Sequence, residues 1–340
     1  GGAYLGRVAM ISAGESHSVF LKSDGSVWAV GKNAYGRLGD GSSIQRSNPV
    51  RTVASLGEAI ENTIEISAGN AHQVILKGDG SVWAWGYNEF GQLGDGTTSN
   101  RFNPVQVMKT DGSPMIGVVG ISAGQHHTVF LKSDGTVWAT GRNEDGRLGD
   151  GTNSNRNNPV QVVDAGGSPL SQIIAISAGS MHTVFLKSDG TVYAVGQNGQ
   201  GRLGDGTTSD RTHYVQVMEE SGIPLSGISE ISAGYDFTTF LKSDGTVLGV
   251  GNNSLGQIGD GTSTNRIYPV QVRNMGESLF SGVIKISAGY FHTTFLKADG
   301  TVWATGKNTN GQLGDGTTQN RSNPVQVQNS GGSPLVGVVG

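Results

Sequence analysis

Residues 121–163 read ISAGQHHTVFLKSDGTVWATGRNEDGRLGDGTNSNRNNPVQVV, and close copies of this stretch fill the chain. The string Ile-Ser-Ala-Gly begins at residues 11, 66, 121, 176, 231 and 286, so the period is 55 residues with no insertion. Internal repeats of this length indicate a solenoid or a propeller.

Each copy predicts four short strands. In the third copy these are residues 118–124, HTVFLKS at 127–133, TVWATG at 136–141 and PVQVV at 159–163. Asp134-Gly135 between the second and third strands is a hairpin signal, because glycine supplies the positive φ that a tight turn needs. No long segment has apolar residues at helical spacing, so helices should be few. Four strands per repeat predict an all-β fold: a single β-propeller of six four-stranded blades over residues 1–340.

Composition excludes several classes of function. The 340 residues carry a formal net charge of −4 and contain no cysteine. There is no basic field for nucleic acid, and no apolar run of about 18 residues for a membrane span. No signal peptide is visible, and both an extracellular and a cytosolic location fit.

The repeat resembles that of the regulator of chromosome condensation (RCC1) family in all six copies. The resemblance rests on Gly14 and His17, the turn Asp24-Gly25, Trp28, Gly31 and the stretch NAYGRLGDG at 33–41. It implies a β-propeller, usually of seven blades, so part of a seven-bladed ring is the alternative to six blades. Founding members exchange nucleotide on a small GTPase through a wedge inserted in a blade, and the uninterrupted period argues against that activity here.

The repeated polar residues favour scaffold roles over chemistry. Histidine recurs in five copies, but Phe237 replaces it in the fifth. We therefore expect a buried or half-buried ring that is hydrogen-bonded to a neighbouring backbone group rather than a metal ligand. Ser12 and His17 lack a carboxylate at a fixed place beside them, which argues against nucleophilic catalysis. Aspartates such as Asp40 should cap their own turns, and arginines such as Arg46 should pair with the adjoining blade. We expect no enzyme activity, metal or cofactor.

Variation between copies is concentrated in two loops. The pair after Ile-Ser-Ala-Gly and the residues after the third strand change in every copy, whereas the hairpin tip stays close to Lys-Ser-Asp-Gly. Both variable loops follow strands that run the same way, so they should emerge on one face. The aromatic residues there are concentrated in copies one, two, five and six, which predicts one arc if copy six closes against copy one. The predicted partner-binding residues are Glu15, Lys32, Tyr35, Tyr87, Phe90, Tyr235, Asp236, Leu255, Tyr290, Phe291 and Lys307.

These observations predict a monomeric, non-catalytic module that binds a protein partner through the variable loops. One alternative is a structural or engineered repeat scaffold without a dedicated ligand. Another is a lectin-like binder or a secreted enzyme inhibitor, since a secreted bacterial inhibitor of β-lactamase has a similar propeller. A bacterial secreted or cell-surface location is slightly favoured over the cytoplasm.

Overall fold

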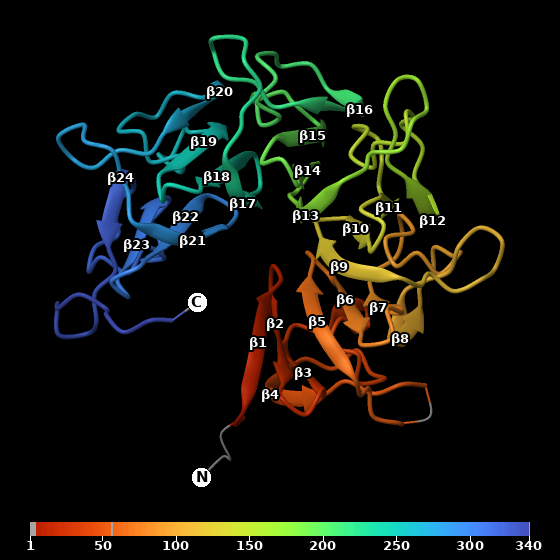
Figure 1. Ribbon diagram of the computed structural model, residues 1–340. Helices are drawn as coiled ribbons and strands as arrows, with labels where there is room; N and C mark the ends of the chain where they lie inside the picture. Colours follow the sequence, from red (N-terminus) through yellow and green to blue (C-terminus); the bar gives the residue numbers. More distant parts are fainter. Residues whose placement is uncertain (1–4, 56, 340) are drawn as a thin grey trace. The chain divides into compact units, whose positions relative to one another are not determined.

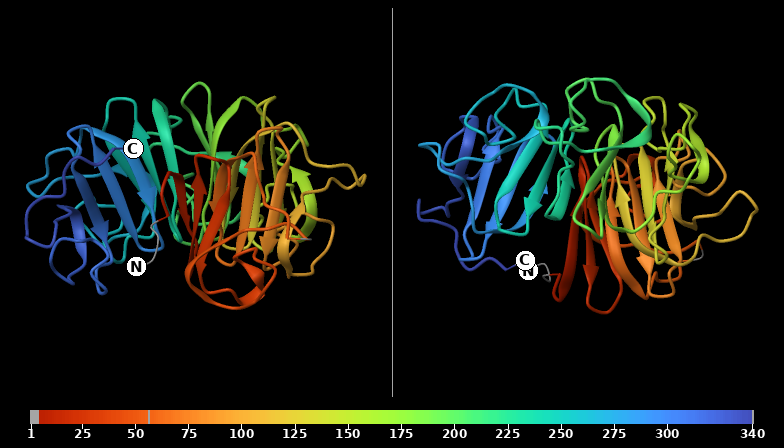
Figure 2. Two further views of the ribbon diagram at one scale, coloured as in Figure 1. Left: turned by 90° about the horizontal axis from the view of Figure 1, so that it is seen from below. Right: turned by 45° about the horizontal axis from the view of Figure 1, so that its top comes forward.

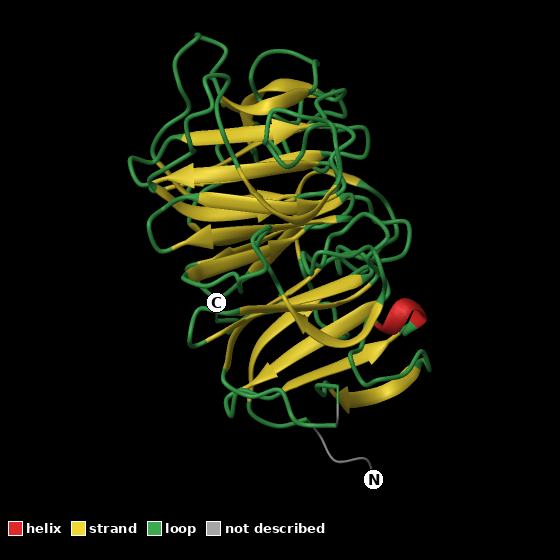
Figure 3. Ribbon diagram, turned by 90° about the vertical axis from the view of Figure 1, so that its right-hand side faces the viewer, coloured by secondary structure: helices red, strands yellow, loops and turns green. Residues whose placement is uncertain are grey.

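The computed structural model describes residues 5–55 and 57–339, which form six four-stranded antiparallel sheets. These sheets are the blades of an all-β propeller, one blade per repeat (Figure 1). Within the described residues the one helix is the 3₁₀ turn η1 (Ala34–Gly36), drawn red in Figure 3. The prediction of four strands per repeat and few helices is confirmed.

The strand bounds repeat with the same period. Blade 1 contains β1 (Val8–Ala13), β2 (His17–Lys22), β3 (Val27–Gly31) and β4 (Arg46–Arg51). Blade 2 contains β5 (Thr63–Ala68), β6 (His72–Lys77), β7 (Val82–Gly86) and β8 (Arg101–Gln106). Blade 3 contains β9 (Val118–Ala123), β10 (His127–Lys132), β11 (Val137–Gly141) and β12 (Arg156–Gln161). Blade 4 contains β13 (Ile173–Ala178), β14 (His182–Lys187), β15 (Val192–Gly196) and β16 (Arg211–Gln216). Blade 5 contains β17 (Ile228–Ala233), β18 (Phe237–Lys242), β19 (Val247–Gly251) and β20 (Arg266–Gln271). Blade 6 contains β21 (Val283–Ala288), β22 (His292–Lys297), β23 (Val302–Gly306) and β24 (Arg321–Gln326).

The chain divides into two compact units, Gly1–Ala178 and Gly179–Gly340. Unit 1 holds the first three blades and β13, and unit 2 holds β14 to β24.

The Asp-Gly turn forms the hairpin of each blade as the sequence predicts. In blade 3, β10 pairs with β11 from His127↔Gly141 to Leu131↔Val137. Gly135 at the turn has φ 76°, and Asp134 Oδ1 accepts a hydrogen bond of 2.9 Å from Thr136 N. The turn therefore needs both residues, because glycine provides the left-handed backbone and aspartate caps it.

The inner strand of a blade carries a β-bulge. Thr63 and Glu65 of β5 pair with Lys77 and Leu76 of β6, so Ile64 is the extra residue between two paired positions. Val119 of β9 has the same place in the next blade. A bulge turns its extra side chain away from the regular alternation of the strand. In unit 1 the inner strand β9 contacts β5 on one side and β13 on the other. The orange strands of blade 2 and the yellow strands of blade 3 lie side by side in Figure 2.

The core lies between neighbouring blades. Val19, Leu21 and Val27 of blade 1 pack with Ile75 and Trp85 of blade 2, all less than 5% exposed. In unit 2, a corresponding cluster joins blades 5 and 6 and includes Phe280 and Phe295, with the half-buried Trp303 against it. Both faces of a packed blade are thus apolar, which explains the continuous hydrophobic runs in these short strands.

Blade 1 has no preceding blade in unit 1, and its first face is correspondingly open. Ile11 is 72% exposed, whereas the equivalent Ile66 and Ile121 are 5% exposed. The exposure follows from position in the unit, because Ile66 and Ile121 are buried against the blade that precedes them, and Ile176, which follows blade 3, is half-buried.

A contact within each blade accounts for the repeated glycine and histidine. A Cβ added to Gly69 would lie 2.3 Å from His72 Cε1 and 2.6 Å from Gly124 O of the next blade. Glycine is therefore required there by close approach rather than by backbone conformation. Ser67 of the same string also crosses the junction, because its Oγ accepts a 2.9 Å hydrogen bond from Ala123 N.

The histidine is a structural residue at these junctions. His72 Nε2 and Thr128 Oγ1 share a hydrogen bond of 3.1 Å, and Thr128 donates its hydroxyl proton to Gln92 O at 2.7 Å. Since the hydroxyl proton is already used, His72 must donate from Nε2. Burial lowers the pKa of His72 to about 3, which agrees with a neutral ring. The prediction of a buried, hydrogen-bonded histidine is confirmed for His72 and His182, although the partner is a threonine side chain rather than a backbone group. It is wrong for His17, which is buried with neither ring nitrogen hydrogen-bonded.

The predicted pairing of the repeated arginines with the adjoining blade is wrong. Arg46 pairs with Asp40 of its own blade at 2.7 Å, and Arg101 pairs with Asp95 at 2.6 Å. The Asp lies six residues before the Arg in every copy, so the loop between the third and fourth strands can fold back and bring them together. The arginine closes this loop rather than joining two blades.

Candidate functional site

The two variable loops of each copy meet at one end of their blade. The first residue after the third strand donates its backbone N–H to the carbonyl of the last variable residue before the second strand. In unit 1 these bonds are Lys32 to Ser16, Tyr87 to Ala71 and Arg142 to His126. In unit 2 they are Gln197 to Met181, Asn252 to Asp236 and Lys307 to Phe291. The prediction that both loops emerge together within a blade is confirmed.

The repeated Asn, Asp and Arg hold the loop after the third strand. In blade 3, Asn143 Nδ2 donates to Asp150 Oδ1 at 2.9 Å, and its own Oδ1 accepts from Leu148 N at 2.9 Å. Arg156 Nε donates to Asp150 Oδ2 at 2.7 Å, and Thr152 Oγ1 donates to Oδ1 at 2.8 Å. Burial works to raise the pKa of Asp150, but hydrogen bonds from Thr152 and Arg156 hold it below its usual value. Asn143, Asp150 and Arg156 thus form a clamp, and this clamp holds a loop whose other residues change from copy to copy.

In unit 1 the variable loops of three blades form one aromatic cluster, Tyr35, Tyr87, Phe90 and His126. Ring centroids are 4.9 Å apart for Tyr35 and Tyr87, 6.1 Å for Tyr87 and Phe90, and 5.2 Å for Phe90 and His126. Tyr35 is 46% exposed, while the other three are half-buried. Tyr35 also has φ 67°, a left-handed conformation that is rare for a bulky residue.

Charged groups surround the unit 1 cluster. The guanidinium carbon of Arg142 lies 5.0 Å from the Phe90 centroid, and Arg142 pairs with Glu144. Tyr87 donates its hydroxyl to Glu89, and burial together with this bond raises the pKa of Tyr87 to about 12. Burial and the charges of Arg142 and Arg147 lower the pKa of His126 to about 4. The histidine is therefore neutral near pH 7 and packs as an aromatic ring.

In unit 2 a second aromatic cluster consists of Tyr235, Tyr290 and Phe291. The Tyr235 and Tyr290 rings are stacked, with centroids 5.1 Å apart and planes at 25°. Phe291 lies 5.4 Å from Tyr235, and Lys307 Nζ is 5.5 Å from the Phe291 centroid. Tyr290 is 38% exposed and the other two rings are half-buried.

The remaining predicted residues have simpler positions. Glu15 and Lys32 are exposed in unit 1. Asp236 is in a 2.7 Å ion pair with Arg202, whose side chain is 3% exposed. Leu255 is half-buried, and its backbone N–H donates to Gln257 Oε1 at 2.9 Å.

The structure also adds residues that sequence reasoning missed. His126, Arg142 and Arg202 contact predicted residues although none was among the candidates. His126 and Arg142 stand at the variable positions, so the change between copies was a usable signal for them. Arg202 lies outside the two variable sets, and only the fold brings it to Asp236.

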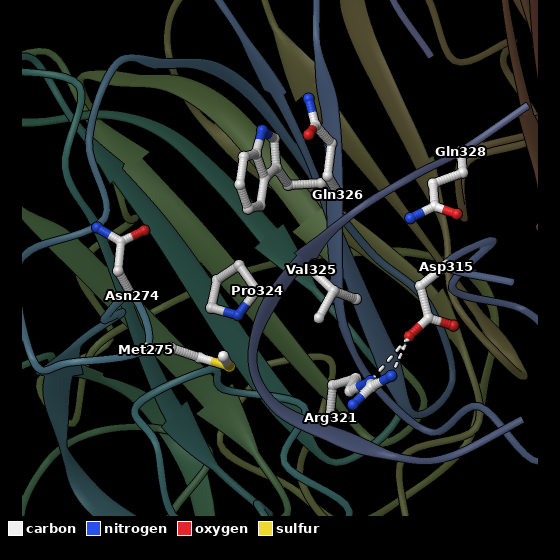
Figure 4. Close-up of a pocket in the computed structure, with 9 residues that line it drawn as sticks. Asn274, Met275, Asp315, Arg321, Pro324, Val325, Gln326 and Gln328 are labelled. Carbon is white, nitrogen blue, oxygen red and sulfur yellow. Dashed lines mark hydrogen bonds and ion pairs between the residues drawn. The ribbon is translucent and has the colours of Figure 1, made fainter. Parts of the chain in front are cut away.

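Unit 2 contains a hollow that none of the rings of the aromatic cluster lines; it lies beside blade 6 and the segment after β20. It is lined by Asn274, Met275, Trp303, Asp315, Arg321, Pro324, Val325, Gln326 and Gln328 (Figure 4). Its two charged side chains, Asp315 and Arg321, pair with each other at 2.7 Å as in the other blades. The hollow is thus lined by the loop clamp and the outer strand, which are scaffold in every copy.

The part of the chain that the structure describes shows neither a metal-binding group nor a membrane-spanning helix. No group of three or more histidine, cysteine, aspartate or glutamate residues is arranged to hold a metal ion in residues 5–55 and 57–339. Across the same ranges, no helix has the length and hydropathy needed to cross a bilayer.

A family model described as the RCC1-like domain matches residues 3–219 and again residues 59–339. The chain belongs to the RCC1-like domain family. The ultraviolet-B receptor UVR8 of Arabidopsis thaliana is 32% identical over 323 residues, covering 95% of this chain and 70% of UVR8. The human E3 ubiquitin-protein ligase HERC2 is 35% identical over 202 residues, which cover 59% of this chain but only 4% of HERC2.

Solved structures show the same RCC1-like fold. Human WBSCR16 aligns with a TM-score of 0.82 at 20% identity, covering 96% of this chain and 83% of WBSCR16. Yeast RCC1 (Prp20), solved bound to Kap60, aligns with a TM-score of 0.79 at 19% identity over 95% of this chain and 75% of Prp20. At these identities the likeness establishes the fold alone.

Proposed function

We propose that this RCC1-like chain is a non-catalytic binding module that recognises a protein partner through its variable loops. The observation that carries the proposal is the gathering of variable aromatic residues into the two clusters. Tyr35, Tyr87 and Phe90 of unit 1 lie on loops that the repeated Asn and Asp residues hold in place. The unit 2 rings lie on the loops after Ile-Ser-Ala-Gly, which are joined to the loops after the third strand by backbone hydrogen bonds. A repeat that needed these rings only for folding would keep them at one position in nearly every copy, as it does with the core phenylalanines, which Ile75 replaces in the second copy alone.

The composition of both clusters suits a protein interface. Exposed tyrosines beside arginine or lysine are typical of the few residues that supply most of the binding energy, roughly 2 kcal/mol or more each. Held loops lose little conformational entropy when a partner binds. A relative supports this use of the fold, because yeast RCC1 was solved in complex with the protein Kap60.

Comparative capture of partners from the source cell's extract tests the proposal. Immobilised wild-type chain is compared with a unit 2 variant (Tyr235→Ala, Tyr290→Ala, Phe291→Ala) and a unit 1 variant (Tyr35→Ala, Tyr87→Ala, Phe90→Ala). Ser188→Ala, at an exposed hairpin tip where other copies already hold glycine or alanine, is the matched control. Proteins retained by wild type and control but lost from a cluster variant support the proposal.

Equal retention by all four proteins would reject the loop clusters as the binding surface. Retention of no protein by the wild-type chain would favour the scaffold alternative instead.

A further inference from the structure

The third residue of the inner strand differs between blades in charge and size. In chain order it is Met10, Glu65, Gly120, Ala175, Glu230 and Lys285. In unit 2, Glu230 Oε2 lies 4.0 Å from Lys285 Nζ on the next blade. In unit 1, Glu65 occupies the place of Glu230, and Gly120 occupies the place of the lysine.

Glu65 is therefore a half-buried carboxyl group, and the residue on the next blade that corresponds to Lys285 is a glycine. Its Oε1 accepts a 3.5 Å hydrogen bond from Ile121 N, the residue after Gly120. Among the described residues Glu65 takes part in no salt bridge, and burial raises its pKa to about 7. A carboxylate removed from water without a cation is unfavourable, so a positive group beside it would be stabilising.

There is room for such a group. A Cβ built on Gly120 meets only Leu131, at 3.6 Å, which is ordinary van der Waals contact. A side chain can therefore begin at this position without overlap at its Cβ, as the side chain of Lys285 does in blade 6.

Exposed apolar residues stand directly before Glu65 and its equivalents on the inner strands of unit 1. Ile64, Val119 and Ile174 are the residues just before Glu65, Gly120 and Ala175, and they are 55%, 54% and 58% exposed. They lie on β5, β9 and β13, which contact one another in unit 1. A lysine side chain combines a four-carbon apolar stem with a terminal charge, which matches exposed apolar residues that stand next to a carboxylate along the strand.

We propose that Glu65, the space over Gly120 and the strip of Ile64, Val119 and Ile174 form a subsite for a lysine side chain of a peptide partner. The ammonium group takes the position that Lys285 Nζ holds beside Glu230, and the methylene groups cover Ile64 and Val119. The subsite lies on the inner strands of unit 1, away from the variable loops, so it is independent of the function proposed above.

The test uses a short capped peptide with one central lysine flanked by leucines, and the same peptide with norleucine at that place. Fluorescence anisotropy with the whole chain at about pH 8, where Glu65 is ionised, should show about tenfold or tighter binding of the lysine peptide. Glu65→Gln and Gly120→Lys should each remove that preference, the second because its own lysine fills the space. Ala175→Lys is the matched control, since it adds the same residue beside Gly120 rather than beside a carboxylate.

Thermal unfolding of Gly120→Lys distinguishes occupation of the subsite from misfolding, since the restored ion pair predicts an unchanged or higher midpoint. Equal binding of the lysine and norleucine peptides, or unchanged binding by Glu65→Gln, would overturn the proposal. Cadaverine binding as tightly as the peptide would overturn the assignment to a peptide partner.

Discussion

At the scale of single residues, glycine and histidine at each blade junction are coupled by contact. The Gly69 backbone lies against the His72 ring and against a carbonyl oxygen of the next blade, so the glycine cannot gain a side chain. The ring can change, since Phe237 lies against Gly234 in the same way in the fifth copy. The constraint on the glycine explains why Ile-Ser-Ala-Gly is so uniform while the next two residues differ in every copy.

Gly69→Ala should destabilise unit 1 by about 3 kcal/mol, because the added methyl group overlaps buried atoms that cannot move apart freely. Urea unfolding followed by tryptophan fluorescence measures the loss. Gly120→Ala is the control, since its Cβ would make only ordinary contacts, and it should change stability by about 0.5 kcal/mol or less. Equal losses for both variants would contradict the packing argument.

Glu65 makes the stability of unit 1 depend on pH. Its pKa is raised from 4.5 to about 7 by burial, so the folded state holds the proton more tightly than the unfolded state does. The stabilisation is complete below about pH 4.5 and is lost as the pH rises through about 7.

Glu65→Gln should therefore match wild type near pH 4 and exceed its unfolding free energy by about 2 kcal/mol near pH 8. Urea unfolding over this pH range measures the difference. A constant difference at all pH values would show that the carboxyl group does not titrate as inferred.

At the scale of elements, the loop after the third strand combines clamp residues that recur in every copy with neighbouring residues that differ between copies. Asn143, Asp150 and Arg156 recur in every blade as the clamp, whereas Arg142 and Asp145 belong to the third blade alone. The sequence predicted the strands, the hairpin turn and the capping aspartates, because each depends on residues close together in the chain. It failed for the arginines, because a motif does not say whether a side chain folds back or reaches a neighbouring blade.

Asp150→Ala should loosen this loop without unfolding the blade. We expect faster amide hydrogen exchange in residues 143–156 and a stability loss of about 2 kcal/mol, since Arg156 and Asn143 lose a common partner. Asp134→Ala is the matched control at the other end of blade 3, where faster exchange should stay within the hairpin tip. Uniformly faster exchange across blade 3 in both variants would contradict a local clamp.

At the scale of the whole molecule, the six copies agree in their cores, junctions and clamps and disagree in their loops. The period and strand pattern were sufficient to predict the blades, because the fold is built from one local unit repeated. The ring contacts between blades in each cluster could not be predicted, since they join loops of neighbouring copies and depend on how blades pack. The prediction that copies one, two, five and six form one arc stays a prediction.

Both clusters should contribute to recognition, so changing either one alone should weaken binding of the partner. Against a partner identified by capture, the unit 1 and unit 2 triple alanine variants should each weaken affinity by about tenfold or more. Surface plasmon resonance on the purified pair measures both losses. A loss confined to one variant would restrict the interface to that unit.

Replacing the loops while keeping the scaffold tests the central claim most directly. In this variant the variable residues of copies one, two, five and six are exchanged for those of copy four: Ser180, Met181, Gln197, Gly199 and Gln200. The unfolding midpoint and partner capture are then measured on the same protein. Our account predicts an unfolding transition close to wild type and no capture of the partner. Undiminished capture by this variant would contradict it.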